Sequence, residues 1–259
     1  MTYCVGIRVK EGLVALADGR VTTGSQMASA RKVSLFGEAP NQFFIMTSGL
    51  RSVRDKVLAY LTQEWAQSSE PGFNGMLDAV GAFTECLRRV AVEDEKALAK
   101  SDLTFNLHAI IGGQLKRDGT PTMFLVYPEG NWIEVDERTP YLSIGATTYG
   151  KPILDRALRY DTEIRHALKL AYLSFDSTRF SSTDVGFPID MLCYTVADRV
   201  WREDHFAYDD LVEQRQWWNQ NLTELAERMP DGPWLDSLLV GSDDRFTLIR
   251  ASSSDGPDR

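Results

Sequence analysis

The sequence predicts an α+β domain in which two antiparallel β-sheets are flanked by pairs of helices. Strand-like segments come first, followed by two helical segments, further strands, two more helices and a last group of strands. This order lacks the strict strand–helix alternation that builds a parallel sheet. The 259 residues show no internal repeat and no long linker, and they are enough to bury one full core. We therefore expect one domain with the helices outside the two sheets.

The first elements form a hairpin that fixes the start of the chain. Apolar residues over 3–9 and 13–17 predict two strands, and a tight turn at 10–12 joins them. Chain termini usually fray unless they are tied into a sheet. A strand that begins at residue 3 therefore gives the N-terminus the rigidity that a catalytic group there would need.

Later elements are assigned where apolar residues recur at helical spacing or run between turn signals. After a polar stretch over 22–29, we expect strands near 32–36 and 42–47, helices over 50–65 and 77–90, strands at 105–115, 122–127 and 131–135, helices over 151–158 and 162–172, strands at 189–196 and 200–205, a helix over 209–229, a strand at 245–250 and a disordered tail over 251–259. Residues 1–206 are expected to form the main part of the domain. Residues 207–259 would be a C-terminal elaboration of it.

Composition excludes several classes of function. The formal net charge is -9 with no lysine or arginine cluster, which argues against binding to nucleic acid or to an anionic membrane. No apolar run approaches the ~18 residues needed to cross a bilayer, and no signal peptide is evident. The three cysteines and three histidines are scattered without ligand spacing. We expect a cytoplasmic protein with no metal and no cofactor.

Thr2 stands directly behind the initiator Met1. Threonine is small enough that a preceding initiator methionine is normally removed. Removal would place a hydroxyl nucleophile and a free α-amine, able to act as its base, on the same residue. Many chains begin Met-Thr without any such role, so position alone does not assign catalysis to Thr2.

Two charged residues are expected close to Thr2. Asp18 ends the second strand of the predicted hairpin, so it should lie at the same end of the sheet as Thr2. Lys32 begins the next predicted strand. A carboxylate, an ammonium and a terminal threonine could therefore converge. The alternative interpretations are a turn residue before Gly19 for Asp18 and a solvated strand charge for Lys32.

The ordered set of these motifs resembles the N-terminal half of a proteasome β subunit. The set comprises Thr2, Ala-Asp-Gly-Arg-Val-Thr at 17–22, Arg-Lys-Val at 31–33 and Ser-Gly at 48–49, with a weaker match from 144–147 onward. Together they cover about the first 200 residues. The start Met-Thr-Tyr-Cys-Val-Gly and the segment 149–156 are most similar to Anbu, the bacterial ancestral β subunit. The resemblance implies the four-layer αββα sandwich of the N-terminal-nucleophile (Ntn) hydrolases.

The resemblance also implies the catalytic roles. The Thr2 hydroxyl would attack a peptide carbonyl, and the Thr2 α-amine would accept its proton. The Lys32 cation would lower the pKa of that amine, and Asp18 would hold Lys32 in place. The backbone N–H of Gly49 would face the oxyanion. The implied activity is that of a threonine-type endopeptidase, a hydrolase of the proteasome type.

Further site residues are carried over with departures from the family pattern. Arg20 and Thr22 would line the substrate cleft, Thr22 mostly through its backbone. The serine that assists the terminal amine in proteasome β subunits aligns with Ala146, and the candidates to replace its hydroxyl are Thr147 and Thr148. The family's later Asp-and-Ser element has no clean match.

Asp176 and Asp184 are the two candidates for that later element. Asp176 is followed by Ser177, and Asp184 lies in the segment Thr183-Asp184-Val185-Gly186.

The expected partners are a peptide or unfolded-protein substrate, further copies of the chain in a large ring or open spiral, and an unidentified unfoldase. An apolar stripe with Trp217, Trp218, Leu222 and Leu225 either packs on its own domain or forms an assembly surface. Two other functions compete: an Ntn amidase acting on a small amide, and a catalytically silent assembly subunit. The complete set of Thr2, Asp18 and Lys32 argues against a silent subunit.

Overall fold

The computed structural model describes residues 2–23, 26–67 and 72–239. The chain divides into two compact units, Met1–Leu211 and Val212–Arg259. The prediction of one domain with an elaboration from residue 207 stays a prediction. Among the described residues, no helix combines the length and the apolar character needed to cross a membrane.

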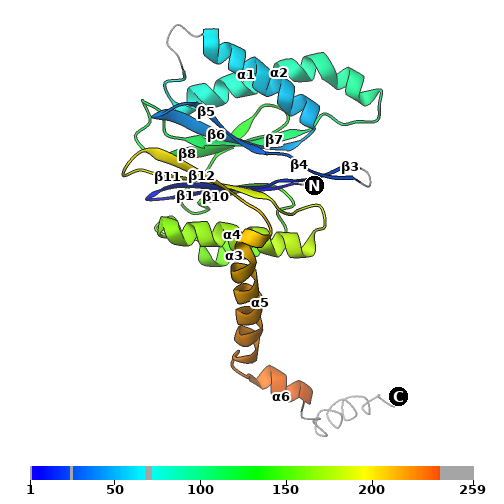
Figure 1. Cartoon of the computed structure of the whole chain (residues 1–259), viewed down its shortest axis with the longest axis vertical. Helices are drawn as coiled ribbons and strands as arrows, with labels where there is room; N and C mark the ends of the chain where they lie inside the picture. Colours follow the sequence, from blue (N-terminus) through cyan, green and yellow to red (C-terminus); the bar gives the residue numbers. More distant parts are fainter. Residues whose placement is uncertain (1, 24–25, 68–71, 240–259) are drawn as a thin grey trace, which may run out of the picture. The chain divides into compact units, whose positions relative to one another are not determined.

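The first unit is a four-layer αββα sandwich, which confirms the predicted fold class (Figure 1). One five-stranded sheet has the order β10-β1-β2-β11-β12, and the other has the order β5-β6-β7-β8-β9. Helices α1 and α2 cover the second sheet, and helices α3 and α4 cover the first (Figure 1). All the strand pairings in these two sheets are antiparallel.

The elements have the following bounds. The strands are β1 (Tyr3–Val9), β2 (Gly12–Asp18), β3 (Arg20–Thr23), β4 (Gln26–Ser29), β5 (Val33–Glu38), β6 (Asn41–Gly49), β7 (Leu107–Gly113), β8 (Thr122–Val126), β9 (Trp132–Glu134), β10 (Tyr141–Gly145), β11 (Ile189–Thr195) and β12 (Val200–Phe206). The helices are α1 (Arg51–Gln67), α2 (Met76–Ala99), α3 (Lys151–Ala157), α4 (Ile164–Ser181), a 3₁₀ turn at Asp209–Leu211, α5 (Val212–Glu227) and α6 (Pro233–Leu239).

Alternating side chains on the central strands build the contacts between layers. In β6, Phe43 and Ile45 pack under α1 and α2, whereas Phe44 and Met46 point into the space between the two sheets. Successive residues of a strand face opposite sides, so one apolar strand can serve two cores. The sheet that carries the N-terminal strand β1 likewise has buried apolar side chains on both of its faces.

The structure contains elements that the sequence did not predict. The polar stretch over 22–29 contributes to the short hairpin of β3 and β4, and β10 pairs with β1 along its length. Helix α4 extends to Ser181, and α6 was not predicted. The predicted strand at 245–250 and tail at 251–259 lie outside the described residues. The other predicted elements are present with shifted ends.

Candidate active site

The β1–β2 hairpin places the start of the chain beside Asp18. Cys4 pairs with Ala17, which sets Tyr3 opposite Asp18 at the end of the hairpin. The Tyr3 N–H donates a hydrogen bond of 2.8 Å to Asp18 Oδ1. The buried carboxylate therefore anchors the residue that follows Thr2, as the hairpin register requires.

Lys32 lies immediately before β5 and forms a buried ion pair with Asp18. Its Nζ lies 2.6 Å from Asp18 Oδ1 and donates a second hydrogen bond of 2.6 Å to the carbonyl oxygen of Arg20. The side chains are only 7% and 0% exposed, respectively. The alternative of a solvated strand charge at Lys32 is therefore wrong. So is the alternative of a simple turn residue at Asp18.

Opposing effects act on the pKa of the Asp18 carboxylate. Burial raises its pKa above the ordinary value, while the Lys32 ammonium and the backbone N–H groups of Tyr3 and Gly186 oppose that rise. The Gly186 N–H lies 3.4 Å from Asp18 Oδ2. Donors from the N-terminal strand, from Lys32 and from the loop before β11 thus converge on one carboxylate.

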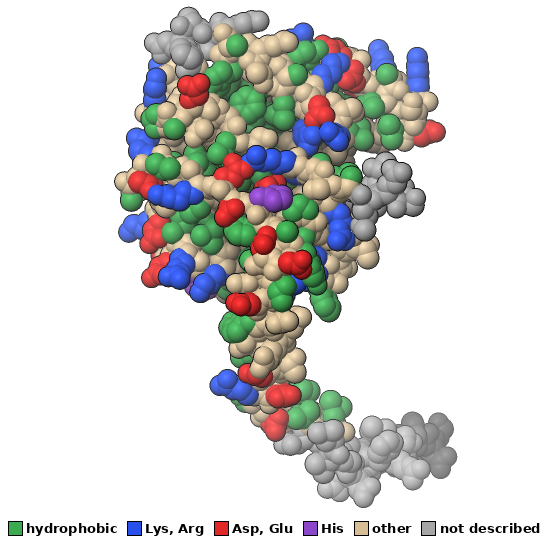
Figure 2. Space-filling model, viewed as in Figure 1, with side chains coloured by type: hydrophobic (Ala, Val, Ile, Leu, Met, Phe, Trp, Pro, Cys, Tyr) green, Lys and Arg blue, Asp and Glu red, His purple; other side chains and the backbone are tan. Residues whose placement is uncertain are grey.

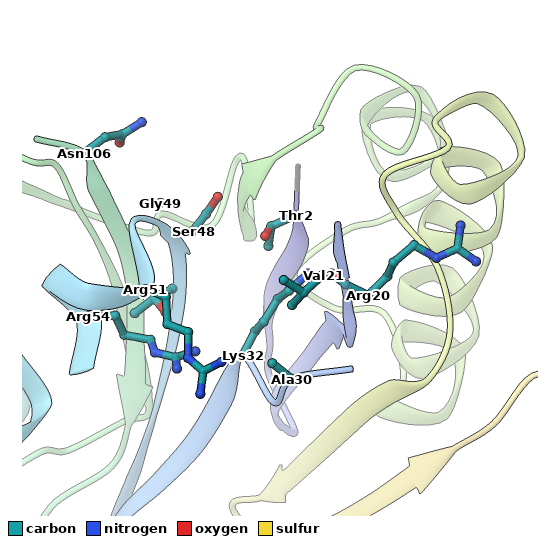
Figure 3. A pocket seen from close by; sticks show the side chains of 11 residues that line it. Thr2, Arg20, Val21, Ala30, Lys32, Ser48, Gly49, Arg51, Arg54 and Asn106 are labelled. Carbon is teal, nitrogen blue, oxygen red and sulfur yellow. Dashed lines mark hydrogen bonds between the residues drawn. The ribbon is translucent and has the colours of Figure 1, made fainter. Parts of the chain in front are cut away.

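A cavity of about 350 Å³ opens beside this ion pair. Thr2, Lys32, Thr47, Ser48 and Gly49 contribute to its wall, together with residues from β3, the segment before β5 and the start of α1. Figure 3 shows Lys32 reaching toward Thr2 from just before β5, while Ser48 and Gly49 lie across the space at the end of β6. The cavity brings together three of the four residues predicted to act in catalysis, Thr2, Lys32 and Gly49. The fourth, Asp18, is connected to it through its contact with Lys32.

Gly49 has a backbone conformation that other residues rarely adopt. Its φ is +137°, and a Cβ added there would lie 2.2 Å from the Asn106 carbonyl oxygen. That oxygen also accepts a hydrogen bond of 2.9 Å from the Leu50 N–H. The end of β6 is therefore held against the chain entering β7, and only glycine fits this close approach.

The oxyanion role that the resemblance implies for Gly49 predicts that Gly49→Ala lowers the rate of acylation at Thr2 by about 10²- to 10³-fold. The added Cβ forces the backbone at residue 49 to move. Gly81→Ala is the matched control, because a Cβ at Gly81 meets nothing within 4 Å. That helical substitution should stabilise the protein by roughly 0.5–1 kcal/mol. A folded Gly49→Ala variant that reacts at the control rate would remove Gly49 from the site.

Arg20 is among the residues that line the cavity, although its guanidinium points out of it (Figure 3). Its Nη1 donates a hydrogen bond of 2.8 Å to the Thr183 carbonyl. The guanidinium lies so close to Gly186 that a Cβ there would be 2.4 Å from Arg20 Cζ. Only the carbonyl of Arg20 reaches Lys32. The Arg20 side chain therefore joins the 183–186 loop to β3.

Gly19 and Thr22 are close to Arg20 in the sequence and make contacts of their own. Gly19 allows a close approach of two chain segments: its N–H donates a hydrogen bond of 2.6 Å to the Pro188 carbonyl oxygen, and a Cβ there would lie 2.8 Å from the same oxygen. Thr22 lies on β3 and pairs with Met27 on β4. Its backbone therefore runs along the short hairpin that borders the cavity.

The segment around Ala146 holds Thr2 through the main chain. The Ala146 N–H donates a hydrogen bond of 2.7 Å to the Thr2 carbonyl, and the Thr147 N–H bonds back to the Gly145 carbonyl. Gly145 has a φ of +88°, and a Cβ there would collide with the Thr2 carbonyl. Neither Ala146 nor Thr147 lines the cavity. The segment therefore meets the site through the hydrogen bond from Ala146 to the backbone of Thr2.

Asp176 and Asp184 occupy different surroundings. Asp176 is buried in α4, where Oδ1 accepts hydrogen bonds from Arg179 Nη2 at 2.7 Å and Nε at 3.1 Å. Asp184 lies in the following loop, whose Gly186 N–H reaches Asp18. The loop thus meets the site through the backbone of Gly186, which sequence reasoning did not single out.

Cys4 is excluded as the nucleophile by its position. It is fully buried between the two sheets, and burial raises the pKa of its thiol. Two arginines that line the cavity, Arg51 and Arg54, were missed by sequence reasoning. The available signal was their spacing of three residues at the start of the helix that follows Gly49, which places them on one face.

Comparisons with known proteins agree with this architecture. A family model described as proteasome subunit matches residues 2–193. "Proteasome subunit beta 1" of Pyrobaculum arsenaticum is 24% identical over 199 residues, which is 76% of this chain and 92% of that protein.

Solved structures of Anbu, the ancestral β-subunit, match over most of the chain. Anbu from Yersinia bercovieri is 29% identical with a TM-score of 0.80, covering 89% of this chain and 98% of that one. The structure titled helical assembly of the Anbu complex from Pseudomonas aeruginosa is 31% identical with a TM-score of 0.82, at the same coverage. The family match spans well over half of the sequence. The chain belongs to the proteasome subunit family.

Proposed function

We propose that this protein is a threonine-type peptidase that uses Thr2 as its nucleophile within an assembly of identical subunits. The observation that carries the proposal is the Lys32 ammonium, which is held by Asp18 and the Arg20 carbonyl at a cavity that Thr2 and Gly49 also line. The mechanism requires removal of Met1, which frees the α-amine of Thr2. Family membership supports the same conclusion.

In the acylation step, the Thr2 Oγ attacks the scissile carbonyl carbon and its proton passes to the α-amine. Free α-amines titrate near ~8, and the nearby Lys32 cation disfavours the protonated form, so more free base is present at neutral pH. The Gly49 N–H stabilises the oxyanion. The protonated amine then gives its proton to the leaving amine, and an acyl ester remains on Thr2.

In the deacylation step, the same α-amine activates a water molecule. The water attacks the ester carbonyl, the ester bond breaks, and the proton returns to Thr2 Oγ. Asp18 contributes by fixing Lys32 and by anchoring Tyr3, the residue next to the nucleophile. These contacts restrict the nucleophile and its base to one arrangement through both steps.

A pair of substrate panels tests the reaction class. We expect the purified, Met1-free protein to cleave internal bonds of unstructured peptides and to turn over simple acyl amides poorly. Hydrolysis of small amides without peptide cleavage would favour the competing Ntn amidase. Absence of both turnover and acylation by a threonine-reactive epoxyketone would instead identify a silent subunit.

The second unit supports the assembly part of the proposal. Six apolar side chains in the described part of this unit are more than half exposed within the single chain: Trp217, Leu222, Leu225, Met229, Trp234 and Leu238. Large exposed apolar groups that include tryptophan are typical of protein–protein interfaces. The P. aeruginosa relative was solved as a helical assembly.

We expect the double substitution Trp217→Asp and Leu222→Asp to shift the protein from a large oligomer to smaller species. Charges placed at a buried interface must lose their hydration without gaining partners. Light scattering after size exclusion measures the mass. Gln220→Asp is the matched control, because Gln220 is an exposed polar residue of the same helix. Equal masses for the double variant and the control would exclude this surface from assembly.

A further inference from the structure

The charged side chains around the cavity are all basic among the described residues that line it. They are Arg20, Lys32, Arg51 and Arg54. The outer face in Figure 2 instead intermingles acidic and basic side chains. The Arg20 side chain points away (Figure 3), and Lys32 is neutralised by Asp18. Arg51 and Arg54 are left as the two cations available to a molecule in the cavity.

These two arginines share one carboxylate. Arg54 donates to Asp55 Oδ1 from Nε at 2.9 Å and from Nη2 at 2.7 Å, and Arg51 Nε lies 3.4 Å from Asp55 Oδ2. Two guanidinium groups against one carboxylate leave an excess of one positive charge. Asp55 does not line the cavity, whereas both arginines do. The excess positive charge therefore acts on a molecule inside the cavity.

The pair combines a fixed and a mobile donor. The Arg54 side chain is 17% exposed, and its Nη1 also donates to the Arg31 carbonyl at 3.2 Å. Arg51 is 71% exposed on its side chain, and within the described part of the chain its one ion pair is the long contact to Asp55. Arg51 can therefore turn toward a ligand, whereas Arg54 is pre-oriented. Guanidinium groups bind carboxylates through two parallel hydrogen bonds.

We propose that Arg51 and Arg54 bind an Asp or Glu side chain of the substrate, on the residue that carries the scissile carbonyl. The inference rests on the proposed function, because it takes Thr2 as the point of attack. Thr2 and both arginines line the same cavity of about 350 Å³. It has room for the reacting carbonyl of the substrate and for the side chain of the residue that carries it. An acidic residue before the scissile bond places its carboxylate against Arg51 and Arg54. A basic residue at the same position is repelled by them.

The direct test is binding to the Thr2→Ala variant, which separates recognition from turnover. Two fluorescent peptides that differ only by Glu or Gln at the residue before the scissile bond, both with amidated C-termini, are compared at low ionic strength. We expect the Glu peptide to bind about tenfold more tightly, the size of one charge-assisted hydrogen-bond pair. The difference should shrink as salt screens the charges.

Three further substitutions in the Thr2→Ala background define the recognition site. Arg51→Gln should remove most of the Glu preference, since it deletes the exposed cation without disturbing buried contacts. Asp55→Asn should increase the preference several-fold, because both arginines then lose their competing carboxylate. A purely structural role for this cluster would not tighten acid binding. Arg165→Gln, an exposed arginine of α4 outside the cavity, should change nothing.

Each remaining outcome decides against the inference. Equal affinities, tighter binding of the Gln peptide, or no binding of either peptide would overturn it. A Gln peptide with a free C-terminal carboxylate is also compared with its amidated form. If only this pair differs in affinity, and the amidated Glu and Gln peptides bind equally, the arginines bind a chain terminus instead of a side chain. Cleavage of Glu, Gln and Leu peptides by the unsubstituted protein is scored separately. Peptide cleavage without acid preference would leave the proposed function standing and remove only the acidic specificity.

Discussion

Replacing Thr2 by alanine is expected to lower the acylation rate by at least about 10⁴-fold, because the variant has no hydroxyl to attack the substrate. The substitution leaves the main-chain contacts in place. The Thr2 carbonyl still accepts from the Ala146 N–H, and the Tyr3 N–H still donates to Asp18. Fold and assembly should therefore be unchanged. The measurement is the rate of covalent labelling by a peptide epoxyketone, followed by intact-mass spectrometry.

Thr2→Ser is the matched variant for this experiment. It keeps the hydroxyl and the α-amine on the same residue and loses only a methyl group. We expect measurable labelling, slower than that of the unsubstituted protein and far faster than that of Thr2→Ala. Labelling of Thr2→Ala at an undiminished rate would place the nucleophile elsewhere and exclude the mechanism.

Lys32→Ala is expected to lose nearly as much activity as Thr2→Ala, and it should also destabilise the protein. The effects of substituting catalytic groups that act as a unit are not additive. Without the Lys32 cation, the pKa of the Thr2 α-amine is no longer lowered, so the amine activates the hydroxyl poorly. The variant also leaves the Asp18 carboxylate, which is fully buried, without its ammonium partner. Removing one partner of a buried ion pair costs about 3–5 kcal/mol.

The stability loss of Lys32→Ala should depend on pH in a defined direction. Burial already raises the pKa of Asp18, and removal of Lys32 leaves that rise without its main opposing charge. The folded variant then binds the Asp18 proton more tightly than the unfolded chain does. The destabilisation is greatest above the folded pKa and declines as the pH falls from that value to the unfolded pKa, about 3.9.

Denaturant unfolding across this pH range measures the stability effect, and epoxyketone labelling measures the activity. Lys56→Ala is the matched control: the Lys56 ammonium contacts Glu93 and Asp94 on the helix surface, outside the residues that line the cavity. It should leave labelling unchanged. A Lys32→Ala variant that is labelled as fast as this control would show that Lys32 has no catalytic part.

Much of the fold follows from local sequence patterns. The apolar runs of β1 and β2 and the helical spacing of α1 and α2 predict these elements, and the order of strand groups and helix pairs predicts two sheets with helices outside them. β10 was missed because its five residues become a strand through pairing with β1, with Tyr3 opposite Gly145, and that contact is distant in sequence. The β3–β4 hairpin is short and polar, so it carries no hydrophobic period to detect.

Some contacts of the candidate site could be predicted from the sequence, and others could not. The hairpin register brings Asp18 to Tyr3, and a sequence can show that register. The Gly186 N–H and the Arg20 carbonyl act through the backbone, which no side-chain pattern reveals. Arg51 carries an exposed charge that looks like ordinary helix surface until the structure places it at the cavity beside Thr2.

Intact-mass spectrometry of the purified protein, before and after treatment with a peptide epoxyketone, tests the central claim most directly. We predict a starting mass that lacks Met1 and a treated mass increased by one inhibitor per chain, with the adduct confined to the N-terminal peptide that begins at Thr2. A chain that keeps Met1 under active conditions, or an adduct located on another residue, would contradict the account.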